Sequence, residues 1–167
     1  MSGSPAPGFR LRDQSGRWLS LSHLRGKVVV LEFMDPECRQ TCPIVARELV
    51  STVRRLGPRA DDVAFVAVNV NQHEASVRSV RRFSRARGLA ALPSWHFVTG
   101  AAPTLRRVWS DYGVFVGAQH HGDVVHSSLM YFIGRRGRER YLIQPGSRRS
   151  SIPASATLMT SLVGELL

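Results

Sequence analysis

The sequence has no run of about 18 apolar residues, the length that a helix needs to cross a lipid bilayer. The segment 1–8 is too short and too polar to serve as a secretory signal, which needs a positively charged start and an apolar centre. We therefore expect the chain as written to be soluble. Any anchor or export signal would have to lie in an upstream segment outside it.

Lysine and acidic residues are also scarce, so the charge is strongly one-sided. The chain has 23 lysines and arginines against 12 acidic residues, a net charge of +11, and Lys27 is its single lysine. The arginines are spread along the chain, and aromatic residues do not alternate with them as a nucleic-acid stacking platform would require. We expect solvated helix faces and no nucleic-acid partner. Such a surface also suits anionic lipid head groups or an acidic protein.

The size and the pattern of apolar residues predict one folded domain over residues 1–167. The segment 28–33 is a continuous apolar run typical of a strand buried on both faces. Further strands are predicted at 63–70, 95–100, 124–133 and 139–143, with a turn at 134–137, and helices at 42–56, 74–87, 103–112 and 154–167. This alternation predicts an α/β sandwich: a mixed central sheet flanked by helices, with an N-terminal extension, a C-terminal β-hairpin and a closing helix.

The only two cysteines, Cys38 and Cys42, are separated by three residues and lie where a buried strand passes into a helix. Pro43 suits a first helical turn, because its missing N–H would have had no partner there. If the helix begins at about Cys42, the positive end of its dipole favours the thiolate of that residue. The sulfur of Cys38, one turn earlier, can approach it. Such a pair can form a disulfide or clamp a soft metal ion.

Two alternatives would give the cysteine pair no chemical function. Free cysteines are often small buried hydrophobes without chemistry, but a chance pair would seldom fall on a strand-to-helix loop with a proline after it. A structural disulfide would close a very short loop and would constrain the unfolded chain little. A peroxiredoxin is disfavoured by spacing, since Arg39 and Asp35 occupy the positions where that chemistry needs threonine or serine and proline.

These residues resemble the Sco/SenC family, whose members are copper proteins with a thioredoxin-like fold that assist assembly of the binuclear copper centre of cytochrome c oxidase. The resemblance covers roughly residues 5 to 145 in the order of the family. The matching segments are 7–16, 24–30, C-x-x-x-C-P at 38–43, SWHFVTG at 94–100, and Val-His-Ser-Ser at 125–128 ahead of Tyr131. The cysteine motif combined with a distal histidine-serine pair is the specific part of this pattern.

The resemblance implies a copper ion held by Cys38, Cys42 and His126. Thiolates select Cu(I) and imidazole also suits Cu(II), so this set can hold both oxidation states. Strand alternation places His126 on one face with Val124, Ser128 and Met130. A core histidine satisfied by a backbone carbonyl is the alternative for this position.

The other candidate residues receive lesser roles. Asp123 is a candidate to orient His126 without binding the metal itself. We expect His120 and His121 to be exposed loop residues and His96 to pack structurally. Met34 and Met130 are expected in the core.

The chain departs from the family pattern in two loops. Asn-Val-Asn-Gln-His-Glu stands at 69–74 where the family usually has an Asp-Pro segment, and Arg-Arg-Gly stands at 135–137 where Pro-Asp-Gly is common. Neither change touches the implied ligands. Loops around a site are where partners dock, so these changes bear on the partner surface.

Two functions follow from the same two sulfurs. The first is a copper metallochaperone that delivers copper to, or prepares, the binuclear copper site of a cytochrome c oxidase subunit, or serves another copper protein. The second is an enzyme, a thiol-disulfide oxidoreductase, with Cys38 as the attacking sulfur, Cys42 as the resolving sulfur and a thiol reductant to restore the pair. His126 discriminates between them, because thiol exchange does not need it.

Both functions belong outside the reducing cytosol. We therefore expect an extracytoplasmic domain that a segment absent from this chain tethers to the plasma membrane.

Overall fold

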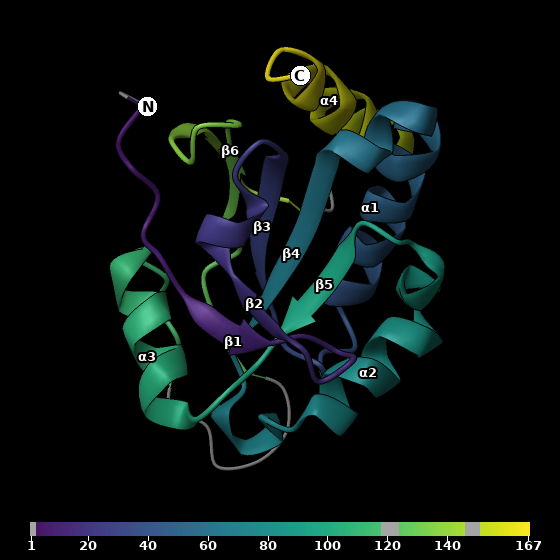
Figure 1. Cartoon of the computed structure of the whole chain (residues 1–167). Helices are drawn as coiled ribbons and strands as arrows, with labels where there is room; N and C mark the ends of the chain where they lie inside the picture. The colour runs from purple at the N-terminus through teal and green to yellow at the C-terminus, as the bar shows by residue number, and fades with distance from the viewer. Residues whose placement is uncertain (1–2, 118–123, 146–150) are drawn as a thin grey trace.

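The apolar segment after Lys27 forms the central strand of the sheet, β3 (Val28–Met34), and all seven of its residues are buried. The computed structural model describes residues 3–117, 124–145 and 151–167 (Figure 1). β3 pairs in parallel with β4 (Val63–Asn69), and β4 with β5 (Trp95–Val98). On its other edge β3 pairs antiparallel with β6 (Met130–Ile133), and β6 with β7 (Glu139–Ile143). The sheet is therefore mixed, in the order β5-β4-β3-β6-β7, as predicted.

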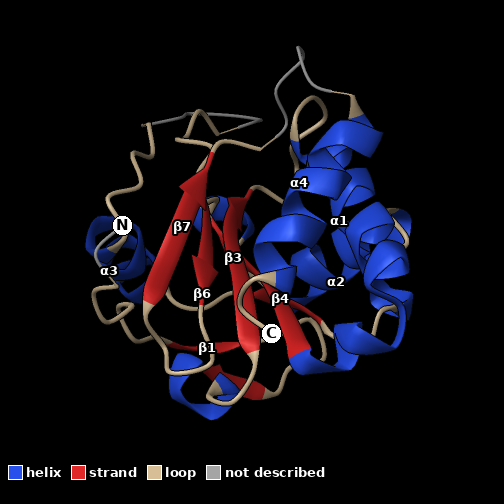
Figure 2. Ribbon diagram, turned by 90° about the horizontal axis from the view of Figure 1, so that it is seen from above, coloured by secondary structure: helices blue, strands red, loops and turns tan. Residues whose placement is uncertain are grey.

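Helices cover both faces of this sheet, which explains why its central strands are apolar on both sides. Three helices, α1 (Cys42–Leu56), α2 (Val77–Ala86) and α4 (Ile152–Gly164), pack on one face (Figure 2). The opposite face carries α3 (Ala102–Asp111) and the hairpin of β1 (Arg10–Arg12) and β2 (Trp18–Ser20). The predicted α/β sandwich with an N-terminal extension and a C-terminal hairpin and helix is confirmed.

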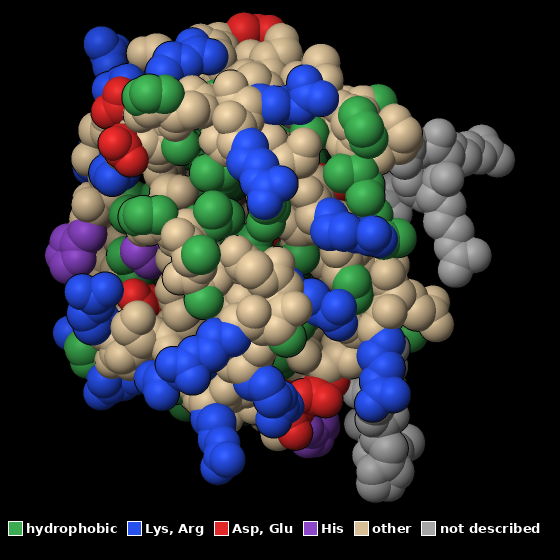
Figure 3. Space-filling view, turned by 90° about the vertical axis from the view of Figure 1, so that its right-hand side faces the viewer, with side chains coloured by type: hydrophobic (Ala, Val, Ile, Leu, Met, Phe, Trp, Pro, Cys, Tyr) green, Lys and Arg blue, Asp and Glu red, His purple; other side chains and the backbone are tan. Residues whose placement is uncertain are grey.

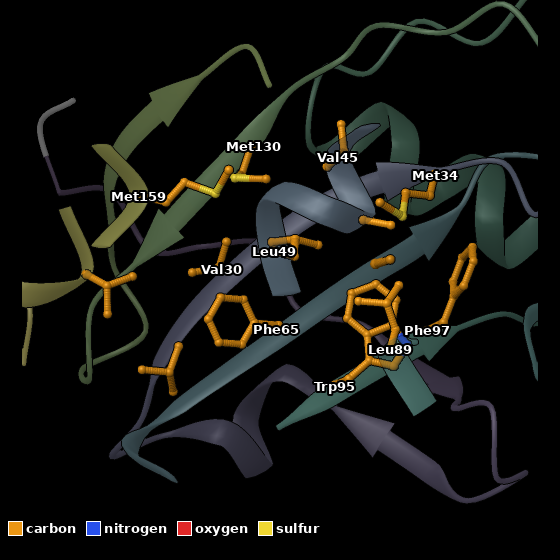
Figure 4. Packing of buried hydrophobic residues seen from close by; sticks show 14 of the residues in the cluster. Val30, Met34, Val45, Leu49, Phe65, Leu89, Trp95, Phe97, Met130 and Met159 are labelled. Carbon is orange, nitrogen blue, oxygen red and sulfur yellow. The ribbon is translucent and has the colours of Figure 1, made fainter. Parts of the chain in front are cut away.

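The core beneath α1 interlocks residues from the sheet and from three helices. Leu49 of α1 lies over Val30 and Phe65 of the central strands, and Met159 of α4 reaches Met130 of β6 (Figure 4). At the other end of the same layer, Met34 lies near Val45 at the start of α1 (Figure 4). This packing fixes the first turn of α1 against the end of β3.

Helix boundaries follow the capping residues rather than the apolar pattern. α2 begins at Val77, three residues later than predicted, because the Ser76 side chain accepts a hydrogen bond from the Ser79 N–H at the helix start. α4 begins at Ile152, two residues earlier than predicted, because Ser151 caps it in the same way and Pro153 fits its first turn.

The strand predicted at 124–133 is wrong over its first half, because only Met130–Ile133 pairs with β3. The preceding residues leave the sheet and pair with a different segment. The N–H of Ser127 donates to the carbonyl oxygen of Phe115 (2.9 Å), and the N–H of Gly117 donates to that of Val125 (2.8 Å). His126 therefore lies in an isolated bridge with Val116 rather than on a strand of the main sheet.

In the described part of the chain, no helix is long and apolar enough to span a membrane. The face formed by α1 and α2 carries arginines separated by neutral and apolar surface (Figure 3). Several arginines are held locally: Arg82 pairs with Glu37, and Arg81 Nε donates to the carbonyl oxygen of Gln14 (2.8 Å).

Candidate metal site in the dithiol pocket

The loop from β3 to α1 brings the two cysteines together at the first turn of the helix. Cys42 is the first residue of α1, and Pro43 follows it in the first turn, as predicted. The side chain of Thr41 does not cap the helix. Instead, the sulfur of Cys38 accepts a hydrogen bond from the Cys42 N–H at 3.3 Å. The first N–H group of the helix, which has no partner within the helix, is therefore bonded to Cys38.

This arrangement favours a thiolate on Cys38. A hydrogen bond from the Cys42 thiol, together with backbone N–H groups of Gln40, Thr41 and Cys42, lowers the pKa of Cys38 to about 6, although burial acts against it. The same hydrogen bond raises the pKa of Cys42, and burial raises it further. The prediction that the helix favours a Cys42 thiolate is wrong. The N–H group at the helix start is bonded to the sulfur of Cys38, so the helix lowers the pKa of Cys38 instead.

The two sulfurs also differ in exposure. Cys38 is half-buried and Cys42 is buried, and neither is in a disulfide. Cys38 is thus the more accessible and the more readily ionised sulfur, the combination that nucleophilic attack and metal transfer both need.

Both cysteines line a pocket of about 400 Å³ at the end of β3. We call it the dithiol pocket; its walls include Glu32, Met34, Cys38, Cys42, His126 and Ser128. The structure therefore brings the three predicted ligands to one cavity. In the described segments, however, no three histidine, cysteine, aspartate or glutamate side chains lie close enough together to hold a metal ion as they stand. The ligand set remains a prediction.

His126 presents one ring nitrogen for a ligand. Its Nδ1 lies 2.9 Å from the carbonyl oxygen of Ser127, where it donates as an N–H. The sequence analysis gave a histidine bonded to a backbone carbonyl as the alternative, and Nδ1 does make such a bond. The lone pair is left on Nε2, and hydrogen bonding of Nδ1 to a carbonyl is the usual way of orienting a metal-binding histidine.

The remaining candidates divide into core residues and residues that the structure does not describe. Met34 and Met130 are buried in the core as predicted, and Met34 also borders the pocket. His96 lies on β5 away from the pocket, with Nδ1 3.6 Å from Asp13 Oδ2, and burial lowers its pKa. His120, His121 and Asp123 lie outside the described residues.

The sequence analysis missed Asp35, which is fully buried directly after β3. Its Oδ1 accepts hydrogen bonds from the Glu37 N–H (2.9 Å) and from Asn71 Nδ2 (3.0 Å), and its Oδ2 accepts one from the Val124 N–H (2.9 Å). One carboxylate thus joins the cysteine loop, the loop after β4 and the segment that carries His126. The Asp-Pro dipeptide at 35–36 was the available signal, since aspartate there favours a turn around its own side chain.

Glu32 was also missed, because it was taken as part of an apolar strand. It is 2% exposed, borders the dithiol pocket, and its Oε1 has no hydrogen-bond partner in the described part of the chain. Burial, and next the charge of Glu48, raise the pKa of Glu32 well above its ordinary value. The signal in the sequence was an acidic residue in the middle of an otherwise apolar run.

Comparisons with known proteins identify relatives of the same fold. The SCO1 protein homolog of Bacillus subtilis is 22% identical over 133 residues, which cover 78% of this chain and 68% of that protein. The structure of copper-bound ScoI from Bradyrhizobium japonicum matches with a TM-score of 0.81 at 18% identity, over 98% of this chain and 100% of that one. A SCO1/SenC family lipoprotein from Bacillus anthracis matches with a TM-score of 0.78 at 20% identity, over 96% of each chain. At such identities the structures establish the fold, which is that of the Sco proteins.

The family itself is established by sequence. A family model described as SCO1/SenC matches residues 4–160, nearly the whole chain and every element around the dithiol pocket. The protein therefore belongs to the SCO1/SenC family.

Proposed function

We propose that this protein is a copper metallochaperone that carries copper on Cys38, Cys42 and His126. Its destination is the binuclear copper site of a cytochrome c oxidase subunit or another copper protein. One observation carries the proposal: three groups border one pocket, namely a sulfur with a pKa of about 6, a second sulfur, and a histidine that is bonded to the described residues only through Nδ1. Thiolates bind Cu(I) and imidazole adds affinity for Cu(II), so these donors suit copper in either state.

Delivery by ligand exchange follows from the unequal exposure of the two sulfurs. Copper is the cargo here, and it has to pass from these donors to the cysteines of an acceptor. Because Cys38 is half-buried and Cys42 is buried, an incoming thiolate reaches the Cys38 side first. Because its pKa is about 6, Cys38 is available as a thiolate at neutral pH. Protons therefore compete only weakly with copper for this sulfur.

The same asymmetry supports a second candidate function, reduction of a partner disulfide. The Cys38 thiolate would attack one sulfur of that disulfide, forming a mixed disulfide and releasing one partner thiolate. Cys42, after losing its proton, would attack Cys38 Sγ and release the second partner sulfur. The partner gains two electrons, and Cys38 and Cys42 end as a disulfide that a thiol reductant must restore.

Both functions suit a location outside the cytosol, with the protein tethered to the plasma membrane. A family member from Bacillus anthracis is a lipoprotein, which supports this location. Oxidation of a cysteine pair is controllable there, whereas the cytosol keeps thiols reduced.

Anaerobic titration of the reduced protein with Cu(I) and with Cu(II), in competition with a chelator, tests the proposal. We expect one equivalent of copper bound through sulfur. The variant His126→Ala should bind about tenfold or more weakly, because it loses a donor. His96→Ala is the matched control, since His96 is also partly buried but lies beside Asp13 and not at the pocket. If the wild type does not retain copper and its Cys38–Cys42 disulfide is readily reduced, the oxidoreductase is the correct function.

A further inference from the structure

Glu32 is a glutamate in the middle of a strand whose other six residues are apolar. The side chains of a strand alternate between faces, so Glu32 shares its face with Val30 and Met34. These two belong to the core cluster beneath α1 that includes Cys42, and Figure 4 shows both pointing toward that helix. Placing a carboxyl group in such surroundings is costly unless it is paired. A purely structural strand would carry valine or leucine there.

The carboxyl group of Glu32 differs in its hydrogen bonding from that of Asp35, another buried acid at the end of β3. Asp35, three residues later, accepts three hydrogen bonds through its two oxygens. Glu32 Oε1 accepts none from the described residues, although less than 1 Å² of its surface meets solvent. Buried polar atoms are almost always bonded, and an exception is explained by strain, by a functional role, or by a bound water or ion.

The position of Glu32 identifies the kind of partner. It borders the dithiol pocket together with Cys38, Cys42 and His126, and its carboxyl group lies close enough to Cys42 for the two groups to interact electrostatically. The charge of Glu48 lies close enough to disfavour a second negative charge here. A cation in the pocket would relieve both the missing bond and the repulsion.

We propose that Glu32 is a fourth metal ligand of the dithiol pocket, an oxygen donor that strengthens the binding of Cu(II) relative to Cu(I). The proposal rests on the copper-carrying function argued above. Carboxylate oxygens suit harder, divalent ions, whereas Cu(I) is satisfied by thiolates. Two thiolates and a carboxylate also supply three negative charges, which a divalent ion neutralises better than a monovalent one.

This assignment gives the pocket a function beyond retention of copper. A site with two sulfurs and one imidazole holds both oxidation states, and an added oxygen ligand shifts the balance toward the oxidised ion. The reduction potential of the bound copper should therefore be lower with Glu32 than without it.

The test compares Glu32→Gln with Glu48→Gln, using Cu(II) and Cu(I) alone as probes. Both variants replace one buried glutamate by its neutral isostere, but only Glu32 borders the pocket. We expect Glu32→Gln to weaken Cu(II) binding by about 10–100-fold, to change Cu(I) affinity by less than threefold, and to alter the Cu(II) electron paramagnetic resonance spectrum after rapid anaerobic mixing. Glu48→Gln removes a charge near Glu32 but no side chain that lines the pocket, so it should change Cu(II) affinity by far less and leave the spectrum unchanged.

Each other outcome has a definite meaning. Equal Cu(II) affinity and an unchanged spectrum in Glu32→Gln would overturn the proposal while leaving the chaperone function intact. Equal weakening of both copper ions would also overturn it, because that pattern indicates a general disturbance of the pocket. Failure of the wild type to hold copper would overturn the chaperone function instead. If Glu32→Gln does not fold, Glu32→Leu removes the same oxygens while keeping the core apolar, and the same measurements apply.

Discussion

Two regions on opposite sides of β3 treat buried polar groups in opposite ways. One is the dithiol pocket. The other, which we call the aromatic cluster, consists of Phe33, Trp109, Tyr112 and Tyr131 beneath α3. In the aromatic cluster every side-chain polar group is bonded: Tyr131 OH to the Tyr112 carbonyl oxygen (2.6 Å), Tyr112 OH to that of Pro7 (2.8 Å) and Trp109 Nε1 to that of Asn69 (2.8 Å).

The dithiol pocket leaves its polar groups available. Within the described residues, Glu32 Oε1 has no hydrogen-bond partner, and His126 is bonded only through Nδ1. Glu32 and Phe33 are neighbours on one strand, yet one side chain costs stability and the other provides it. The comparison indicates that the aromatic cluster stabilises the fold. The pocket keeps polar groups unbonded for a ligand, at some cost in folding stability.

The largest expected effect is on the aromatic side. Phe33 is 3% exposed and its ring lies 5.6 Å from that of Tyr112, centroid to centroid. Phe33→Ala should lower the free energy of unfolding by about 3–5 kcal/mol through lost contacts and a cavity. Urea unfolding of the reduced protein measures this loss.

Phe33 also borders the dithiol pocket, but its ring packs on Tyr112 and Tyr131, so the same variant should leave the ionisation of Cys38 unchanged. The pH dependence of Cys38 alkylation, with a midpoint near 6 in the wild type, serves as the control. A displaced midpoint in folded Phe33→Ala would show that the two regions are coupled and would break the comparison.

The next effect has the opposite sign. Replacing Glu32 by leucine should raise the free energy of unfolding by about 1–4 kcal/mol at neutral pH, because a buried carboxyl group with an unbonded oxygen is replaced by a packed apolar side chain. Urea unfolding of the reduced wild type and variant measures this gain. A destabilised Glu32→Leu protein would show that Glu32 supports the fold.

The pH dependence of this gain has a definite direction. Folding raises the pKa of Glu32 above the 4.5 of an exposed glutamate, mainly through burial and next through the charge of Glu48. The folded chain therefore holds the proton to higher pH than the unfolded chain does. The stability associated with that proton is fully present below 4.5 and is lost as the pH rises. The advantage of Glu32→Leu over the wild type should widen from pH 5 upward.

A smaller effect is expected where a satisfied acid supports the pocket. Asp35→Asn keeps the shape but replaces one acceptor oxygen by an N–H group, so one of its three donors loses its partner. Because one of those donors is the Val124 N–H, next to the His126 segment, copper affinity should fall by about 10–100-fold. Chelator competition with Cu(I) and Cu(II) measures it.

Asp13→Asn is the matched control for Asp35→Asn. Asp13 is also buried and also closes a turn, with Oδ1 accepting from the N–H groups of Ser15 (2.8 Å) and Arg17 (3.0 Å). It lies beside His96 and not at the pocket. Its substitution should leave copper affinity unchanged, and equal losses in both variants would contradict a positioning role for Asp35.

The smallest expected effect returns to the aromatic cluster. Tyr131→Phe removes the hydroxyl that donates to the carbonyl oxygen of Tyr112, and should cost about 0.5–1.5 kcal/mol of unfolding free energy. Copper affinity should not change. Thermal or urea unfolding, followed by copper competition on the folded variant, checks both statements.

The fold could be predicted because its signals are local. The apolar run of β3, the Cys-Pro start of α1 and the turn before β7 each depend on residues close together in the chain. The segment at 124–129 could not be predicted, since its partners at 115–117 lie on a separate loop and alternation alone cannot reveal the pairing. The prediction grouped His126 with the two cysteines; in the structure His126 lines the same pocket as they do, but it lies in the bridge with Val116 and not on a strand of the main sheet.

The chemistry of the site was less accessible from the sequence. The thiolate was assigned to the wrong cysteine, because the direction in which Cys38 points depends on the loop that Asp35 organises. Glu32 could not be recognised as a functional residue from the sequence. An acid inside an apolar run can be interpreted only when the residues that surround it in the folded chain are known.

By itself the sequence determined the order of strands and helices, the membership in the family and the position of the two cysteines where β3 passes into α1, because these depend on residue type and spacing. Only the tertiary structure decided which sulfur ionises, which acid is satisfied and which is left unpaired. Those properties arise from burial and from hydrogen bonds between segments as distant as Asp35 and Val124, and no local pattern encodes them.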